Sequence, residues 1–422
     1  MNIAVIGSGG REHALCYKLK KSKKISNLIC IPGNAGTKKI AKNINANITD
    51  FENLYKILLK NKIDLIVVGP ENPLVDGIVD FFNVKKIKIF GPNKIASKLE
   101  GSKAFLKNLC KKNNIPTASF GIFDDLVNAK KFIFDNKIPI VVKADGLAAG
   151  KGVTICETKD QAINACIKIL SGKFKSSSKI VIEEYLDGEE MSYFIIVDKN
   201  THKFFGSAQD HKRVGENDIG PNTGGMGAYS PSSIISTELE KKIEEKIIQP
   251  TLSAMKKIGN PFRGFLYAGL MIVKNEPFLI EYNVRMGDPE CQAIMARLDS
   301  DLFEIINLTT NDELNKIEIN WKDEKSICIV LCAKGYPGNY NKDIEIEKLN
   351  DVRVDKDSFI FHAGTYEKEG NIFSSGGRVL NIVSLSNNLW KARNKAITYL
   401  NKINWKNGFF RKDIGWRAID KK

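Results

Sequence analysis

Histidine is scarce in this sequence, and its scarcity excludes several kinds of active site. Only four histidines occur among the 422 residues: His13, His202, His211 and His362. None stands in a pattern with a serine or cysteine and an acid that would predict a nucleophilic triad. We therefore do not expect a hydrolase of that kind, and we interpret His362 as a structural residue.

Cysteine is present but forms no motif. The eight cysteines are scattered, mostly within apolar runs, and no two are spaced as CxxC. This arrangement predicts neither a zinc site nor a disulfide framework. It is typical of reduced thiols in the core of a cytosolic protein.

Long apolar runs are also missing. No stretch reaches the roughly 18 consecutive apolar residues that a membrane-spanning helix needs. The first residues, Met-Asn-Ile-Ala-Val-Ile, carry no basic segment of the kind that begins a leader peptide. We expect a cytoplasmic protein without a leader or membrane span, and no further domain after Lys422.

Arginine is rare relative to lysine. The formal net charge is +15, but only 10 of the 64 basic residues are arginine. Proteins that read nucleic-acid bases most often use arginine for these contacts. The lysines here are spread along the chain rather than gathered in one stripe. We expect no nucleic-acid partner. The positive charge would instead attract anionic small molecules.

The length and the order of elements predict an α/β protein of several domains. Strands and helices alternate in the N-terminal part, which is typical of a parallel sheet covered by helices. Smaller mixed units of strands and helices follow, and the last segment is rich in strands. We expect four units, with boundaries at residues 1–115, 116–190, 191–322 and 323–422.

Three segments carry more specific expectations. Apolar periodicity predicts helices over residues 75–82 and 239–258. Residues 210–231 are predicted to form an irregular loop, because glycines are frequent and apolar anchors are few. Within it, the backbone of residues 220–229 can line a site for a very small ligand, and Asp210-His211-Lys212-Arg213 adds mixed charge just before them.

The turn after the first strand reads Gly7-Ser8-Gly9-Gly10-Arg11. It differs from the dinucleotide-binding motif, because Glu12 stands where a third glycine is required and the second strand ends in Pro32 rather than an acid. Backbone N–H groups at a helix N-terminus, together with Arg11, suit a single phosphate. We expect a phosphate-bearing small substrate here; a plain strand–helix turn is the alternative.

A glycine-rich loop follows a short apolar strand in residues 140–153. Lys143 ends the strand, and the loop carries glycines and a second lysine, namely Gly146, Gly150, Lys151 and Gly152. Glycines let backbone N–H groups approach an anion, and two ammonium groups favour several negative charges. The pattern predicts a grip on polyphosphate. It is not a P-loop, since Gly152 stands where a Ser or Thr would hold magnesium, so a metal must bind elsewhere.

Two further stretches supply what such a loop lacks. Glu281 and Asn283 lie two residues apart in a predicted strand, so both face the same side and offer oxygen ligands suited to magnesium. Arg285 follows at once and could clamp a carboxylate or the charge of a transferring phosphoryl group. In residues 182–190, backbone groups around Glu184 and Leu186 suit an adenine edge, and Glu190 suits ribose hydroxyls. Solvated acidic residues and a half-buried polar strand are the alternatives for these two stretches.

Together these stretches resemble the ATP-grasp superfamily and, more closely, the phosphoribosylamine–glycine ligase (glycinamide ribonucleotide synthetase) family. The resemblance covers essentially the whole chain in order. Its motifs are Gly7 to Ala14, Pro32 to Gly36, Gly69-Pro70-Glu71, Leu99 to Lys103, Lys143 to Gly152, Gln209 to Arg213, Gly220 to Pro231, Arg285 to Glu290 and Arg411 to Arg417. Met286 stands where the family usually has phenylalanine, a conservative apolar change.

The resemblance implies an N-terminal parallel-sheet domain, an ATP-grasp core of two α+β subdomains and a small β-rich C-terminal domain. It also implies a reaction in which ATP, glycine and phosphoribosylamine give glycinamide ribonucleotide, ADP and phosphate through an acyl phosphate of glycine. Magnesium or manganese would be the metal, and we expect a monomer.

The resemblance also assigns residues. Lys103, Lys143 and the loop from Gly146 to Gly152 would hold phosphates, and Glu183, Glu184, Leu186 and Glu190 would hold adenosine. Glu281 and Asn283 would carry the metal, the number of metal ions being open. Lys143, Arg285 and Asp210 would act in catalysis. Substrate contacts are expected from Gly9, Gly10, Arg11, His13, Lys212, Gly224, Gly225 and Asp288.

Three other classes of function compete with this interpretation. Another ATP-grasp ligase or a carboxylase would share the loop of residues 140–153 but not the segments 220–231 and 285–290. An oxidoreductase built on the first sheet is disfavoured by Glu12 and Pro32. A silent structural or nucleic-acid-binding protein is disfavoured by the intact set Lys143, Glu281, Asn283 and Arg285.

Overall fold

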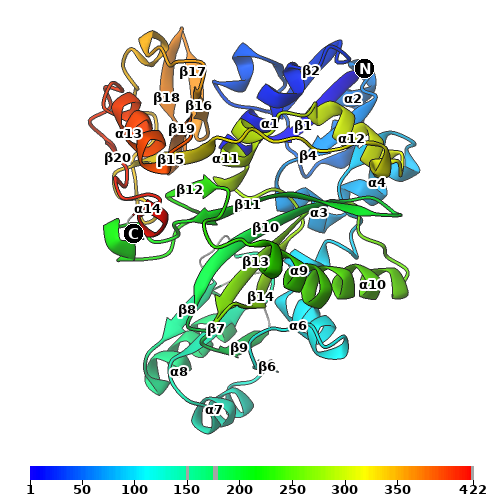
Figure 1. The fold of residues 1–422 in the computed structure, drawn as a ribbon, viewed down its shortest axis with the longest axis vertical. Coiled ribbons are helices and arrows are strands. Elements are labelled where there is room, and N and C mark those ends of the chain that lie inside the picture. Colours follow the sequence, from blue (N-terminus) through cyan, green and yellow to red (C-terminus); the bar gives the residue numbers. More distant parts are fainter. Residues whose placement is uncertain (149–151, 174–178, 420–422) are drawn as a thin grey trace.

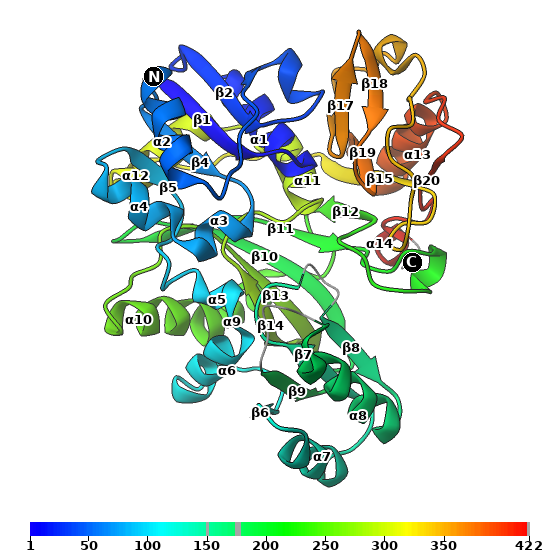
Figure 2. The ribbon, with the colours of Figure 1, turned by 180° about the vertical axis from the view of Figure 1, so that it is seen from behind.

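The computed structural model describes residues 1–148, 152–173 and 179–419. A long, mainly antiparallel sheet runs through the middle of the molecule. Figures 1 and 2 show the N-terminal and C-terminal regions side by side at one end of it, with a smaller unit projecting from the other end. None of the described helices is long and apolar enough to cross a membrane.

The N-terminal region is the expected parallel sheet. Its five strands stand in the order β3-β2-β1-β4-β5, and every neighbouring pair is parallel. The strands are β1 (Asn2–Gly7), β2 (Asn27–Pro32), β3 (Lys42–Asn43), β4 (Leu65–Val68) and β5 (Lys88–Phe90). The chain passes from β1 to β2 on one side and reaches β4 on the other, so the turn after β1 lies at the point where strand order reverses. Open α/β sheets bind ligands at such points.

Helices cover this sheet, and one of them differs from expectation. They are α1 (Gly10–Lys20), α2 (Phe51–Lys60), α3 (Glu71–Asp76), α4 (Ile78–Val84) and the short η1 (Thr37–Lys39). The predicted single helix over residues 75–82 is wrong, since the chain breaks at Gly77 into α3 and α4. Gly77 has a φ of 97°, a left-handed conformation that glycine adopts without strain and that ends a helix.

A small unit with its own core projects from the molecule. Its four-stranded sheet has the order β6-β9-β7-β8 and is covered by two helices; the elements are β6 (Phe120–Phe123), α7 (Leu126–Asp135), β7 (Ile140–Ala144), β8 (Val153–Cys156), α8 (Lys159–Lys168), η2 (Ile169–Lys173) and β9 (Ile180–Glu184). Ala129, Ile133, Val142 and Ile182 belong to a hydrophobic cluster confined to this unit. We call it the lid. Helices α5 (Lys98–Gly101) and α6 (Lys103–Lys112) precede it.

The central sheet has nine strands and extends into the C-terminal region. Its order is β14-β13-β10-β11-β12-β15-β19-β16, with β20 pairing β15. The part that precedes residue 322 comprises β10 (Glu189–Val197), β11 (His202–Asp210), η3 (Glu216–Asp218), β12 (Gly227–Ser230), α9 (Thr237–Ile243), η4 (Glu244–Ile248), α10 (Gln249–Lys257), β13 (Gly264–Val273), β14 (Glu276–Asn283), α11 (Glu290–Arg297), α12 (Leu302–Thr310) and η5 (Leu314–Lys316). The predicted helix over 239–258 is present, with a wider turn at η4 just before Pro250. The ring of Pro250 crowds the carbonyl group one turn earlier in the helix, and a wider turn relieves this crowding.

The segment 210–231 is not wholly irregular. Its last part forms β12, which pairs with β11 through Asp210 and Ala228 and with β15 on its other side. The sequence signal was missed because β12 is only four residues long and begins with Gly227. Since β12 joins the two halves of the central sheet, no break in the sheet marks the boundary expected at residue 322, which remains a prediction.

The C-terminal region completes the sheet and adds a hairpin. Its elements are β15 (Lys325–Ala333), η6 (Leu349–Asp351), β16 (Ser358–His362), β17 (Thr365–Lys368), β18 (Asn371–Ser374), β19 (Arg378–Ser386), α13 (Leu389–Leu400), β20 (Gly408–Phe409) and α14 (Trp416–Ile419). The turn between β16 and β17 faces the N-terminal region, where Asn34 donates a hydrogen bond to the carbonyl of His362. Residues far apart in sequence therefore meet near the turn after β1.

Candidate active site

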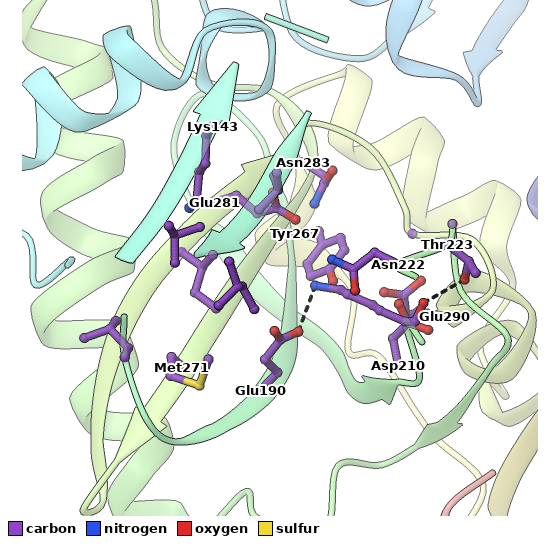
Figure 3. A pocket seen from close by; sticks show the side chains of 18 of the residues that line it. Lys143, Glu190, Asp210, Asn222, Thr223, Tyr267, Met271, Glu281, Asn283 and Glu290 are labelled. Atoms are coloured by element: carbon purple, nitrogen blue, oxygen red, sulfur yellow. Dashed lines mark hydrogen bonds and ion pairs between the residues drawn. The ribbon is translucent and has the colours of Figure 1, made fainter. Parts of the chain in front are cut away.

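A cavity of about 430 Å³ lies between the lid and the central sheet. Its lid side carries Lys143 and Glu183, its floor carries Tyr267 and Glu281 from β13 and β14, and its far end reaches Arg285. Figure 3 shows Lys143, Glu281 and Asn283 pointing into one part of it and Asp210 and Glu290 into another. A volume of this size suits a nucleotide together with a small second ligand.

The structure brings most of the predicted residues to this cavity. Thirteen of them line it: Arg11, Lys143, Glu183, Glu184, Leu186, Glu190, Asp210, Lys212, Gly224, Glu281, Asn283, Arg285 and Asp288. Gly9 lines a second cavity described below. Gly150 and Lys151 lie outside the described residues.

Three predicted residues of the phosphate grip lie beside the cavity rather than on its wall. The ammonium of Lys103 donates to the carbonyl of Gly146 at 2.9 Å, which ties the start of α6 to the glycine loop. The backbone of Gly152 accepts a hydrogen bond from Ala144 and so closes the base of the loop. An added Cβ at Gly152 would lie 2.6 Å from that of Ala148, so only glycine fits.

Glu281 and Asn283 reach the cavity together because they are two residues apart in β14, and an irregularity in this strand adds Ile280 to the same wall. The register between β13 and β14 shifts at Ile280, and the core side chains on either side are Leu279 and Tyr282. Among the described residues, neither Glu281 nor Asn283 makes a side-chain hydrogen bond or an ion pair. Burial alone would raise the pKa of Glu281, but Lys212 and other nearby cations hold it below its ordinary value. The carboxylate is therefore ionised with unused oxygen atoms facing the cavity.

Arg285 is clamped by two carboxylates. Its Nη2 donates to Glu100 at 2.7 Å and its Nε donates to Glu71 at 3.1 Å. Arg285 lowers the pKa of Glu71 to about 2, whereas burial raises that of Glu100 to about 7 despite the same guanidinium. These two hydrogen bonds fix the plane of the guanidinium at the end of the cavity.

The end of β11 forms a corner of mixed charge. Asp210 is half-buried, and its Oδ1, which is buried, accepts no hydrogen bond within the described parts of the chain. Burial raises the pKa of Asp210 well above its ordinary value, and the neighbouring carboxylate of Glu290 adds to the shift. Across the corner, Lys212 forms an ion pair with Glu190 at 2.8 Å, the dashed line beside Glu190 in Figure 3. An unsatisfied buried carboxyl next to cations suits a ligand that carries both an ammonium and a carboxylate.

The packing around Asp210 requires a glycine at position 225. Gly225 has a φ of 109°, and an added Cβ would lie 2.5 Å from Pro289 and 2.8 Å from Oδ1 of Asp210. Its neighbour Gly224 accepts a hydrogen bond from Arg378 of β19. The predicted loop therefore packs directly on Asp210 and Pro289. We call the region around Asp210 and Glu290 the acidic corner.

A second cavity of about 480 Å³ adjoins the first. It is lined by the turns after β1 and β2, including Ser8, Gly9 and Asn34, and by the β16–β17 turn, including Gly364 and Thr365. Asp288 and Arg378 line both cavities, and their side chains pair at 3.5 Å. The two cavities thus share a wall, with Arg378 available to both.

Two of the predicted substrate residues, Gly10 and His13, line neither cavity. A Cβ at Gly10 would collide with Asn381 and Gln292, so Gly10 serves the packing of α1. His13 accepts a hydrogen bond from the backbone of His362 at 2.8 Å, and burial lowers its pKa well below the ordinary value. His362 thus occupies one ring nitrogen of a buried imidazole, and the predicted contact of His13 with the substrate stays a prediction.

Several residues of the site were not predicted. Glu71 and Glu100 lie within two of the family motifs, but the sequence assigned them no role in the site. It assigned none to Tyr267, Glu290 and Arg378 either. A carboxylate that follows the Gly-Pro turn of a parallel strand, as Glu71 does, was the one signal available. Arg378 carries no local signal, because its neighbours are brought to it only by the central sheet.

Comparison with known proteins matches most of the chain to one set of family models. The three domains of phosphoribosylglycinamide synthetase match in order: the N domain over residues 1–100, the ATP-grasp (A) domain over 101–291 and the C domain over 326–417. The chain is 46% identical over 422 residues to the phosphoribosylamine–glycine ligase of Brucella melitensis, covering 100% of this chain and 99% of that one.

Solved structures agree. The crystal structure of phosphoribosylamine–glycine ligase from Thermotoga maritima superimposes with a TM-score of 0.85 at 33% identity, covering 98% of this chain and 100% of that one. Biotin carboxylase from Campylobacter jejuni, in complex with an ATP analogue, superimposes with a TM-score of 0.75 at 16% identity, covering 100% of this chain and 95% of that one. The second likeness concerns the fold alone.

Proposed function

Because the chain belongs to the phosphoribosylglycinamide synthetase family, we propose that it uses ATP to join glycine to phosphoribosylamine. The products are glycinamide ribonucleotide, ADP and phosphate, and the reaction belongs to purine biosynthesis. The observation that carries the proposal is the match of all three family domains in order along the chain. The alternative, a carboxylase, rests on likeness of fold alone.

We place ATP in the part of the cavity under the lid. Apolar side chains of Val141, Ile155, Met271 and Ile280 line that part from both sides and suit the faces of a purine. The backbone around Glu184 and Leu186 lies at its edge, and Glu190 lies further along, where ribose hydroxyls would come. The phosphates then point toward Lys143 and Lys103.

The donor set at the end of β14 fits a magnesium or manganese ion. Glu281 and Asn283 offer oxygen atoms that no described side chain uses. Within the described parts of the chain no group of three or more His, Cys, Asp or Glu side chains is placed to hold a metal. Two protein ligands supplemented by phosphate oxygens and water are the usual arrangement for magnesium with a nucleotide. The ion would neutralise charge on the transferring phosphoryl group.

We place glycine in the corner formed by Asp210 and Glu290. Its ammonium would meet these two carboxyl groups, and its carboxylate would point toward Arg285 and the nucleotide. The room is small, since Gly225 has no space for a Cβ and Tyr267 closes the floor. A larger amino acid would have to displace one of these groups.

We place phosphoribosylamine in the second cavity, with its amine toward the shared wall. Backbone N–H groups of the turn after β1 suit the phosphate, as the sequence predicted for Gly9. Arg378 pairs with one carboxylate oxygen of Asp288 at this wall, and the other oxygen accepts a hydrogen bond from the backbone N–H of Arg11. The amine would thus approach the activated carbonyl from the side opposite ATP.

The proposed reaction needs no covalent enzyme intermediate. A carboxylate oxygen of glycine attacks the γ-phosphorus of ATP, and the bond to ADP breaks. The amine of phosphoribosylamine then attacks the acyl carbon, and inorganic phosphate leaves with the former carboxylate oxygen. The residues contribute position and charge neutralisation, which account for most of the rate enhancement in such transfers. A monomeric state and a cytoplasmic location stay predictions.

The test is the substrate dependence of ADP release, combined with the mass of the product. We expect ADP only when glycine and freshly prepared phosphoribosylamine are both present. Full turnover with glycine alone, or with bicarbonate in its place, would contradict the proposal. Lys143→Ala should lower turnover by about 10²–10³, as expected for loss of one charge-stabilising donor.

A further inference from the structure

A second buried lysine stands behind Lys143 and belongs to none of the contacts described so far. Lys107 lies on α6, one turn after Lys103, and is only 1% exposed. Its ammonium lies 2.9 Å from Oε2 of Glu183 and donates to the hydroxyl of Thr117 at 2.6 Å. The same ammonium lies 5.7 Å from the ring centre of Phe120. Lys107 is thus fixed in place on the far side of Glu183 from the cavity.

Glu183 is shared between two lysines. Lys143 lies 2.9 Å from its Oε1, and Lys107 lies 2.9 Å from its Oε2. Within the described residues no hydrogen bond of regular geometry reaches Oε1, although the ammonium of Lys143 is close. The contact with Lys107 is the more constrained, because Thr117 orients that ammonium. Lys143 is therefore the partner that can leave.

The charges decide what happens when Lys143 leaves. A buried carboxylate that loses its only cation costs several kcal/mol in a typical protein. Here the phosphates of ATP would add negative charge on the same side, which would make an unpaired Glu183 worse. Lys107 removes this penalty, because it keeps Glu183 paired whichever way Lys143 points.

We propose that Lys107 is a positioning residue that holds the charge of Glu183, so that Lys143 can exchange Glu183 for the phosphates of ATP. The proposal rests on the placement of ATP given above. Lys107 does not touch ATP. It acts through Glu183, and its contribution appears only when a polyanion competes for Lys143.

The position of Lys107 supports this. Residues four apart share one face of a helix, so Lys103 and Lys107 both face the lid. Lys103 contacts Gly146, and the backbone of Ala104 donates to Asp145 at 3.1 Å. One helix thus contacts the glycine loop at its start and Glu183 one turn later. Burial lowers the pKa of Lys107, an effect that Glu183 opposes, as expected if the carboxylate keeps it charged.

The experiment is a double-mutant cycle read by ATP binding rather than by turnover. The dissociation constant of magnesium–ATP is measured by titration calorimetry for the native chain, Lys107→Met, Glu183→Gln and the double variant. We expect Lys107→Met to weaken ATP binding by about 10- to 100-fold, since one partner of a buried charge pair is lost. In the background of Glu183→Gln the same change should cost little, because no charge remains to be held.

Three controls separate this from loss of structure. Lys107→Arg should keep ATP affinity within a few-fold of the native value. Lys111→Met, which removes an exposed lysine from the same helix, should change nothing. Thermal unfolding without ATP should change little in Lys107→Met, because Lys143 then pairs Glu183 alone, whereas the rise in Tm on adding ATP should shrink. If Lys107→Met unfolds, the double variant, which has no carboxylate at position 183, still reports whether the charge of Glu183 was the reason.

Equal ATP affinity in Lys107→Met and the native chain would overturn the proposal. So would additive losses in the double variant, which would mean that Lys107 and Glu183 act independently. Either result leaves the ligase assignment intact, because that assignment is tested by the requirement for glycine and phosphoribosylamine. Conversely, ADP release without those substrates would overturn the assignment and leave the cycle interpretable as ATP binding.

Discussion

The guanidinium of Arg285 donates to the carboxylate of Glu100 at 2.7 Å, and burial raises the pKa of that carboxyl to about 7. In an unfolded chain the same group titrates near pH 4.3. Between these values the folded protein retains a proton that the unfolded chain has released. The stabilisation from this proton is present at low pH and is lost as the pH rises toward 7.

A pH-dependent stability follows from Glu100. The free energy of unfolding should fall from pH 5 to pH 8 more steeply in the native chain than in Glu100→Gln, by up to about 3 kcal/mol. Urea unfolding at several pH values measures the difference, and exposed Glu157→Gln is the control. Parallel curves for the native chain and Glu100→Gln would mean that Glu100 ionises normally. Asp210 also has a raised pKa, but it contributes equally to both curves.

A second prediction concerns the proposed metal ligands. Glu281→Gln should lower turnover by about 10²–10³, because one charged ligand beside the phosphates is lost. Higher magnesium should recover part of the rate, which a merely damaged fold would not allow. Glu276→Gln, at the start of the same strand, removes an acid that pairs with Lys242 and Lys246 far from the cavity and should leave turnover unchanged. Turnover within twofold of native in Glu281→Gln would remove this residue from the site.

A third prediction separates the two cavities. Arg378→Ala should raise the KM for phosphoribosylamine by about 10- to 100-fold, the range expected for hydrogen bonds to a charged group. The KM for ATP should change little, because Arg378 lies at the shared wall and not under the lid. Steady-state kinetics with each substrate varied in turn gives the comparison, with exposed Arg353→Ala as the control. An effect confined to ATP would contradict the placement of the substrates.

A fourth prediction uses two glycines that share a backbone conformation. Gly225 and Gly259 both have positive φ, but a Cβ at Gly259 meets nothing within 4 Å, whereas one at Gly225 meets Asp210 and Pro289. Gly259→Ala should cost about 1 kcal/mol of stability and keep its activity. Gly225→Ala should lose at least about tenfold in kcat/KM for glycine, because the acidic corner must shift. Equal activity of the two variants would show that this corner tolerates displacement.

The local parts of the site were predictable from the sequence. A strand with polar residues two apart placed Glu281 and Asn283 at one cavity, and the glycine-rich turns marked the ends of β1 and β7. These inferences depend on periodicity and backbone freedom, which neighbouring residues determine. The shift of register at Ile280, which brings a third side chain of β14 to the cavity wall, has no such local signature.

The long-range parts were not predictable in the same way. The clamp on Arg285 unites Glu71 and Glu100 from the first region with a strand end of the central sheet. Arg378 meets Asp288 only because β12 and β15 extend that sheet. His13, for which the family resemblance implied a substrate contact, lies on α1 and accepts a hydrogen bond from the backbone of His362, a partner that no local pattern indicated. Each case depends on tertiary packing that pattern and spacing do not encode.

The most direct test of the account follows the oxygen atoms of glycine. Glycine labelled with heavy oxygen in its carboxylate is incubated with the protein, ATP and phosphoribosylamine. The mass of the released phosphate is then measured by mass spectrometry. Each phosphate should carry one labelled oxygen, and no phosphate should appear when either glycine or the amine is left out. Unlabelled phosphate, or release that continues without glycine, would contradict it.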